Sequence, residues 1–170
     1  MGGVNRSLGW VQDICAWMAA GATLLLFAIV ALNVLARAIF DATGGGINLL
    51  FSGAVELSQY ALMIAVFAAI PAMLGAGLIR VDILSATLPL RLQKGLDRLW
   101  MALLGVFGGV LSLAFFDLAA TALRRGDATQ DLQWPLWPFY GIAALETLAL
   151  MVLAIGTAVT NYEPGKGPLA

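Results

Sequence analysis

Four long apolar runs, separated by shorter polar stretches, dominate the hydropathy pattern of the chain. The first two runs contain no charged residue, and the third and fourth are each interrupted by one acidic residue, Asp117 and Glu146 respectively. An α-helix needs about 20 predominantly apolar residues to cross the hydrocarbon core of a bilayer. The pattern therefore predicts membrane-spanning helices near 14–36, 57–79, 99–122 and 137–159.

The apolar runs are continuous, whereas the strands of a membrane β-barrel alternate between apolar and polar residues. The first run is also longer than the apolar core of a signal peptide, and a single basic residue, Arg6, precedes it. We therefore predict an all-α protein, an integral membrane four-helix bundle that forms a single membrane domain over residues 1–170.

The connection between the second and third runs has an amphipathic pattern. From Leu88 to Leu99, leucines recur at spacings of four, four and three, which places them on one face of a helix. Pro89 suits the first turn of a helix, where its missing N–H costs nothing. We predict a short interfacial amphipathic helix near 81–88, and a second helix that begins at Pro89 and continues into the third span. The basic residues expected among the lipid head groups are Arg80, Arg91, Lys94 and Arg98.

Basic residues also predict the orientation, because they are enriched in the cytoplasmic connections of membrane proteins. With four spans, both termini lie on the same side as the connection between spans two and three. That side carries Arg6, Arg80, Arg91, Lys94, Arg98 and Lys166. The opposite side carries Arg37, Arg124 and Arg125. We therefore expect both termini in the cytoplasm.

Small residues recur at four-residue spacing in the second and third spans. Ala65 and Ala69 belong to one such row, and Gly105 and Gly109 form another. Small residues let membrane helices approach closely. Such rows either pack within the chain's own bundle or dock a second membrane protein. In addition, Pro71 is expected to kink the second span, because it cannot donate the helical hydrogen bond of its position.

A few polar residues stand out within the apolar runs. Glu146 lies roughly 14 Å into the fourth span at 1.5 Å per residue, close to the bilayer midplane, where a carboxylate is costly unless it is protonated or paired. It is either a proton- or ion-coupling group, or a structural or inter-subunit contact. Glu56 and Tyr60 lie at the outer end of the second span, where they either anchor the helix in the interface or contact a partner.

Composition excludes several classes of function. Of the 170 residues, 61% are hydrophobic and 11% charged, and the net charge of -1 offers no basic surface for nucleic acid. The chain has no histidine and one cysteine, Cys15, and it contains no Gly-rich phosphate loop. We therefore predict no catalytic residue, no cofactor and no metal site, and a protein that is not an enzyme.

Three segments resemble, in order and spacing, the small membrane subunit (Q-type, or DctQ-like) of tripartite ATP-independent periplasmic (TRAP) transporters. The first is VELSQYALMIAVFAAIPAMLGAGLIRVDIL, from Val55 to Leu84. The second and third are TLPLRLQKGLDRLW (87–100) and DLQWPLWPFYGIAAL (131–145). Many members have a histidine before the Val-Asp pair, where this chain has Leu78-Ile79-Arg80.

The resemblance implies a multi-pass subunit of the bacterial inner membrane that pairs with a large membrane subunit as a heterodimer. In that family the large subunit carries the substrate and Na+ sites, and a periplasmic substrate-binding protein delivers an organic acid. The small subunit then acts as a scaffold in contact with membrane lipids. Two alternatives remain at this point. One is an autonomous small proton-coupled exporter acting through Glu146, and the other is the small subunit of a tricarboxylate-type tripartite importer.

Overall fold

Four long helices make up most of the structure. The computed structural model describes residues 2–49, 51–74 and 89–159. The helices are α1 (Gly2–Ala42), α2 (Ala54–Ala72), α3 (Leu90–Arg125) and α4 (Trp137–Val159). Each is long and apolar enough to cross a membrane. In the described part of the chain there is no β-strand, and the predicted all-α membrane bundle is confirmed.

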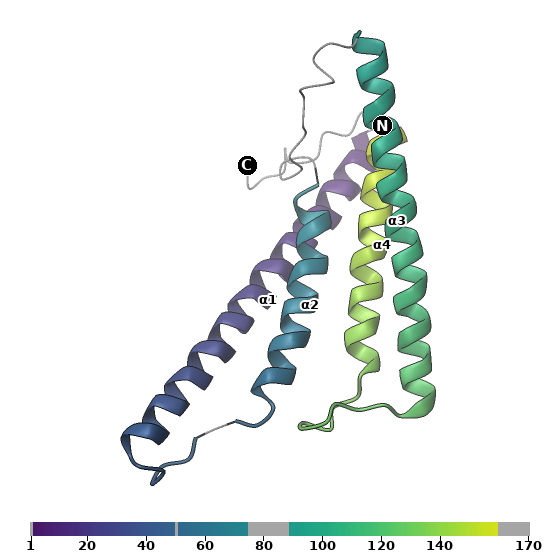
Figure 1. Cartoon of the computed structure of the whole chain (residues 1–170). Helices are drawn as coiled ribbons and strands as arrows, with labels where there is room; N and C mark the ends of the chain where they lie inside the picture. The colour runs from purple at the N-terminus through teal and green to yellow at the C-terminus, as the bar shows by residue number, and fades with distance from the viewer. Residues whose placement is uncertain (1, 50, 75–88, 160–170) are drawn as a thin grey trace.

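The helices alternate in direction, so that α1 begins and α4 ends at the same end of the bundle (Figure 1). The most extensive contacts join α3 to α4 and α1 to α2, and α4 also packs on α2 and, less extensively, on α1. The fold is therefore two helical hairpins held together through α4. Toward its C-terminal end α1 tilts away from α3 and α4 (Figure 1).

The hydrophobic core lies near the end of the bundle where α1 begins. Each of the four helices, or the turn that flanks it, contributes to one cluster of buried residues there. The members of the cluster are Leu8, Leu74, Met101, Leu150, Leu153 and Ala154. At the opposite end α1 diverges, and α2 joins the two hairpins by its contacts with α4 and with the connection between α3 and α4.

Close backbone packing joins α3 to α4. A Cβ atom added at Gly108 would lie 3.0 Å from the backbone nitrogen of Met151 and 3.1 Å from the carbonyl oxygen of Thr147. One turn further along, the Ser112 hydroxyl donates a hydrogen bond of 2.9 Å to the carbonyl of Ala144. A Cβ atom at Gly105 would lie 2.6 Å from the Ile155 side chain, and one at Gly109 would lie 2.9 Å from the Met151 sulfur. The row of Gly105 and Gly109 therefore also packs on α4 within this chain.

The alanine-rich face of α2 is also turned toward the chain's own helices. Ala61, Ala65 and Ala68 are buried, and Ala69 is half-buried. Since α2 contacts α1 and α4, this face lets α2 lie close to α1 in its own hairpin and to α4 in the other.

The second helix ends earlier than the predicted span of 57–79. Pro71 lies in its last turn, and the helix stops at Ala72 instead of kinking and continuing. The N–H groups of Met73 and Leu74 close the end by donating to Ala69 and Pro71. Residues 75–88, and with them Arg80 and the predicted interfacial helix at 81–88, lie outside the described residues.

The predicted start of the third helix agrees with the structure. Pro89 precedes α3, and the helix then runs without a break from Leu90 to Arg125. It ends at Gly126, whose left-handed conformation (φ 70°) lets its N–H bond to the carbonyl of Ala122.

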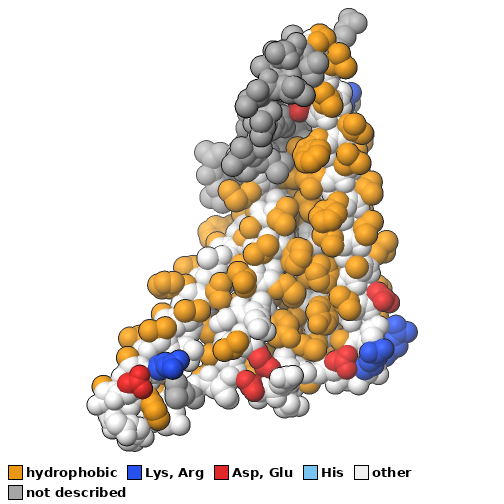
Figure 2. Space-filling view, viewed as in Figure 1, with side chains coloured by type: hydrophobic (Ala, Val, Ile, Leu, Met, Phe, Trp, Pro, Cys, Tyr) orange, Lys and Arg blue, Asp and Glu red, His pale blue; other side chains and the backbone are white. Residues whose placement is uncertain are grey.

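Apolar side chains cover the middle of the visible face, and charged side chains lie toward its ends (Figure 2). Within the most apolar stretch of α1 no residue is buried inside the chain. Phe27 of α1 is 72% exposed and Leu113 of α3 is 73% exposed. Such a surface suits a lipid environment or a neighbouring membrane protein.

The packing of α3 on α4 predicts different tolerance at two adjacent glycines. Gly108→Ala should lower the stability of the protein in detergent by about 1–3 kcal/mol, because the added methyl meets backbone atoms that cannot move aside. Gly109→Ala is the matched control, since its methyl meets the flexible end of Met151 at 2.9 Å. Thermal unfolding measures both variants, and equal losses would contradict this packing.

Candidate functional site

A carboxylate at the N-terminus of α2 holds the connection between α3 and α4. Glu56 accepts hydrogen bonds from the backbone N–H groups of Gln130, Asp131 and Leu132, at 2.6, 3.0 and 3.3 Å. Successive backbone N–H groups form an anion-binding concavity, and the positive end of the α2 dipole favours the same charge. We call Glu56 and these three amides the loop clamp.

The connection itself is a compact turn. Thr129 donates its N–H to the Trp134 carbonyl at 2.8 Å, and Trp134 returns its own N–H to the Thr129 hydroxyl at 3.0 Å. Gln133 adopts a positive φ of 54° to close the turn. Gly53 packs against this turn, since a Cβ there would lie 2.5 Å from Leu132. The turn therefore presents its amides to Glu56 in a fixed arrangement.

Tyr60, one turn further along α2, contacts α4. Its ring stacks on Phe139 with centroids 4.3 Å apart and an interplanar angle of 22°. Nearer the middle of the bundle, Phe67 of α2 meets Phe115 of α3 edge to face at 5.0 Å. The structure thus places Glu56 and Tyr60 together at one end of α2, where both join α2 to the α3–α4 hairpin.

Glu146 lies apart from the loop clamp, in the middle of α4. It is 2% exposed, and neither carboxylate oxygen has a hydrogen-bond partner among the described residues. It lines a cavity of about 230 Å³ between α1 and α4. The remaining lining residues are apolar apart from Cys15; they are Val11, Ile14, Met18, Ile142, Leu145 and Ala149.

Gln12 is a functional residue that the sequence analysis missed. It is buried in α1, and its side-chain amide donates to the carbonyls of Ala72 and Leu74 at 2.9 and 3.4 Å. These carbonyls belong to the end of α2, where helical partners are lacking. The signal available in the sequence was a lone amide at the start of an apolar run, together with a proline near the end of the next.

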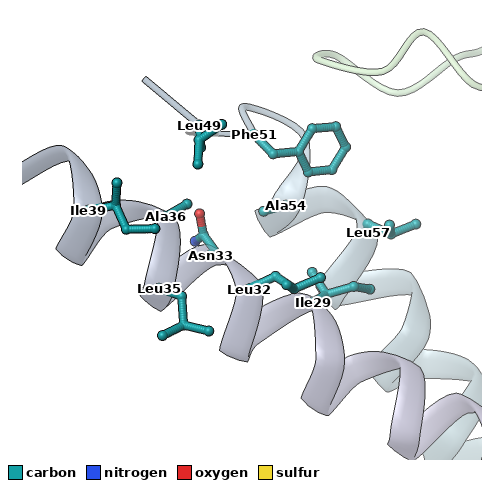
Figure 3. Close-up of a pocket in the computed structure, with 10 residues that line it drawn as sticks. All are labelled: Ile29, Leu32, Asn33, Leu35, Ala36, Ile39, Leu49, Phe51, Ala54 and Leu57. Atoms are coloured by element: carbon teal, nitrogen blue, oxygen red, sulfur yellow. The ribbon is translucent and has the colours of Figure 1, made fainter. Parts of the chain in front are cut away.

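A second, apolar cavity of about 550 Å³ lies between the C-terminal part of α1 and the start of α2. Ile29, Leu32 and Asn33 line it from α1, and Leu49, Phe51 and Leu57 close its other side (Figure 3). Asn33 is the one polar side chain among its lining residues. An apolar groove of about 650 Å³ also runs along α3 and α4, beside Phe116 and Trp137.

The residues expected among lipid head groups lie at the start of α3 so far as the structure describes them. Lys94 and Arg98 are exposed, and Arg91 lies in the first turn of the helix. The leucines at 92, 96 and 99 are exposed as well. The first turns of α3 therefore expose both apolar and basic side chains.

The acidic and thiol side chains of the described residues do not gather into a metal centre. Among them no group of three or more His, Cys, Asp or Glu side chains could hold a metal ion. The polar contacts described above join the chain's own helices and connections. The fold defines a multi-pass helical membrane protein, and the contacts of Gln12, Glu56 and Ser112 join its helices and connections.

The comparison with protein families assigns this membrane protein more narrowly. The model of the DctQ component of tripartite ATP-independent periplasmic transporters matches residues 26–163. The chain belongs to this family, which supplies the small membrane component of TRAP transporters and is a transporter family rather than an enzyme family. The resemblance noted from the three sequence segments is thereby confirmed. Neither the curated proteins nor the solved structures gave a significant match.

The loop clamp predicts a local effect of removing one carboxylate. In Glu56→Ala the amides of residues 130–132 lose their acceptor, so their hydrogen–deuterium exchange should become several-fold faster. Gln59→Ala, an exposed position on the same helix, is the control and should leave this exchange unchanged. Unaltered exchange in Glu56→Ala would show that the clamp does not hold the turn.

Proposed function

We propose that this chain is the scaffold subunit of a Na+-coupled TRAP importer that takes up an organic acid. It forms a heterodimer with the large membrane subunit, and a periplasmic substrate-binding protein delivers the carboxylate solute. The large subunit carries the substrate and Na+ sites, and this chain anchors it in the membrane.

The observation that supports a scaffold best is the exposed apolar surface of α1. No residue in its most apolar stretch is buried within the chain, although α1 extends over about 60 Å at 1.5 Å per residue. Helices in membranes associate through close packing and interhelical hydrogen bonds. A long helix that leans away from its own bundle offers such a surface to a second membrane protein.

The polar groups support the same proposal. A pathway for a solute or an ion needs polar side chains that line a route across the membrane. In the described residues Gln12, Glu56 and Ser112 are engaged in bonds between helices or connections. The other described residues that line the cavity at Glu146 are Cys15 and apolar side chains. An autonomous exporter acting through Glu146 is therefore disfavoured, and the family match favours a TRAP subunit over a tricarboxylate-type one.

The orientation proposed from the basic residues fits this role. With both termini in the cytoplasm, the turn at 127–136 and the connection between α1 and α2 face the periplasm. The loop clamp then holds the periplasmic turn against α2. A binding protein would meet an ordered surface on this side.

Reconstitution into vesicles tests the scaffold role. The purified chain alone should give solute flux at the background of empty vesicles, because the proposal places the substrate and Na+ sites on the large subunit. Vesicles that also contain the large subunit, with the binding protein added outside, should take up a carboxylate solute when a Na+ gradient is imposed. Uptake by the chain alone would overturn the proposal, as would full uptake by the large subunit without this chain.

A further inference from the structure

We infer that the cavity beside Glu146 receives a basic side chain, lysine or arginine, from a transmembrane helix of the large subunit. This inference rests on the proposed function, because it names one contact between the two membrane subunits. It concerns a buried carboxylate that has no hydrogen-bond partner among the described residues.

The first argument is energetic. Glu146 is 2% exposed, and both carboxylate oxygens lack a hydrogen-bond partner among the described residues. It lies about 14 Å from the start of α4 at 1.5 Å per residue, in the interior of a membrane span. A buried polar group without a partner is energetically costly. Acidic residues at this depth in a membrane are usually paired and often functional, so a partner for Glu146 is expected.

The second argument is the shape of the cavity. Its volume of about 230 Å³ is several times the share of one water molecule, about 30 Å³. Glu146 and Cys15 lie deep, at 2% and 3% exposure, while Leu145 and Ile14 at its border are 66% and 39% exposed. The cavity therefore opens to the outside of the bundle between α1 and α4, and the Glu146 carboxylate is buried at its inner end.

The third argument is charge. Among the described residues no basic side chain lines the cavity, and those that do line it are apolar apart from Glu146 and Cys15. A cationic side chain with several N–H donors can satisfy both oxygens at once and neutralise the carboxylate. The aliphatic stem of lysine or arginine packs well against apolar walls. Among uncharged groups, a hydroxyl supplies a single donor, and the amide of Asn or Gln supplies two but leaves the negative charge uncompensated.

Co-purification of the two membrane subunits measures this contact. A tagged form of the chain is co-expressed with the large subunit, and the recovered ratio of the two is compared between variants. Glu146→Gln and Glu146→Leu should each lower the recovery of the large subunit by roughly tenfold or more, because a buried cation is left without its counter-charge. Thr147→Val is the matched control, because the Thr147 hydroxyl bonds to carbonyls of its own helix, and it should recover the large subunit like the wild type.

Glu146→Gln keeps the shape and an acceptor oxygen but removes the charge, so it separates a basic partner from a neutral one. Recovery of the large subunit at the wild-type level by Glu146→Gln would overturn the inference. Thermal unfolding of each variant chain on its own shows whether a loss arises from misfolding. A Glu146→Gln chain that unfolds like the wild type and yet loses the large subunit supports the inference.

Two further comparisons complete the test. Arg80 and Lys166 lie outside the described residues, and Arg80→Gln or Lys166→Gln should not reproduce the loss. If either does, and also lowers the stability of the isolated chain, the cation belongs to this chain and the inference is wrong. If the wild-type chain recovers no large subunit at all, the proposed function fails first, so the two failures are distinguishable.

Discussion

The contact on which the structure depends most is the close approach of α3 to α4. In a bilayer, helices gain little by hiding apolar side chains from one another, so association relies on close packing and on polar bonds between helices. Gly108 supplies the packing, because its missing Cβ lets α3 lie against the backbone of Thr147 and Met151. The bond from Ser112 to the Ala144 carbonyl adds the polar link. With α3 fixed on one side of α4, its other sides remain available for α2 and α1.

The short helix α2 is held at both of its ends by polar contacts, one with α1 and one with the α3–α4 turn. Gln12 of α1 bonds to carbonyls at its C-terminal end, and at its N-terminal end Glu56 accepts three amides of the α3–α4 turn. The length of α2 is about 28 Å at 1.5 Å per residue, which is close to the thickness of the hydrocarbon core of a bilayer. The Gln12 contact joins α2 to α1 within its own hairpin, and the Glu56 contact joins α2 to the other hairpin.

Three features of this DctQ-family chain lie at or beside α1 and leave that helix exposed. The apolar stretch of α1 is unburied, and the cavity of Figure 3 lies beside α1. The cavity that Glu146 lines lies between α1 and α4. All three features involve α1. A protein whose longest helix is its least enclosed one suits a role in which another membrane protein completes the packing.

The sequence by itself determined the four spans, the class of fold and the family, because apolar run length and the order of local motifs are visible along the chain. It also singled out Glu56, Tyr60, Glu146 and the glycines of α3 as unusual. What each of them contacts was decided only by the tertiary structure. That the Glu56 carboxylate binds amides more than 70 positions away depends on how two hairpins dock, and no local pattern encodes it. The early end of α2 and the use of Gln12 likewise follow from a neighbouring helix that supplies donors to its last carbonyls.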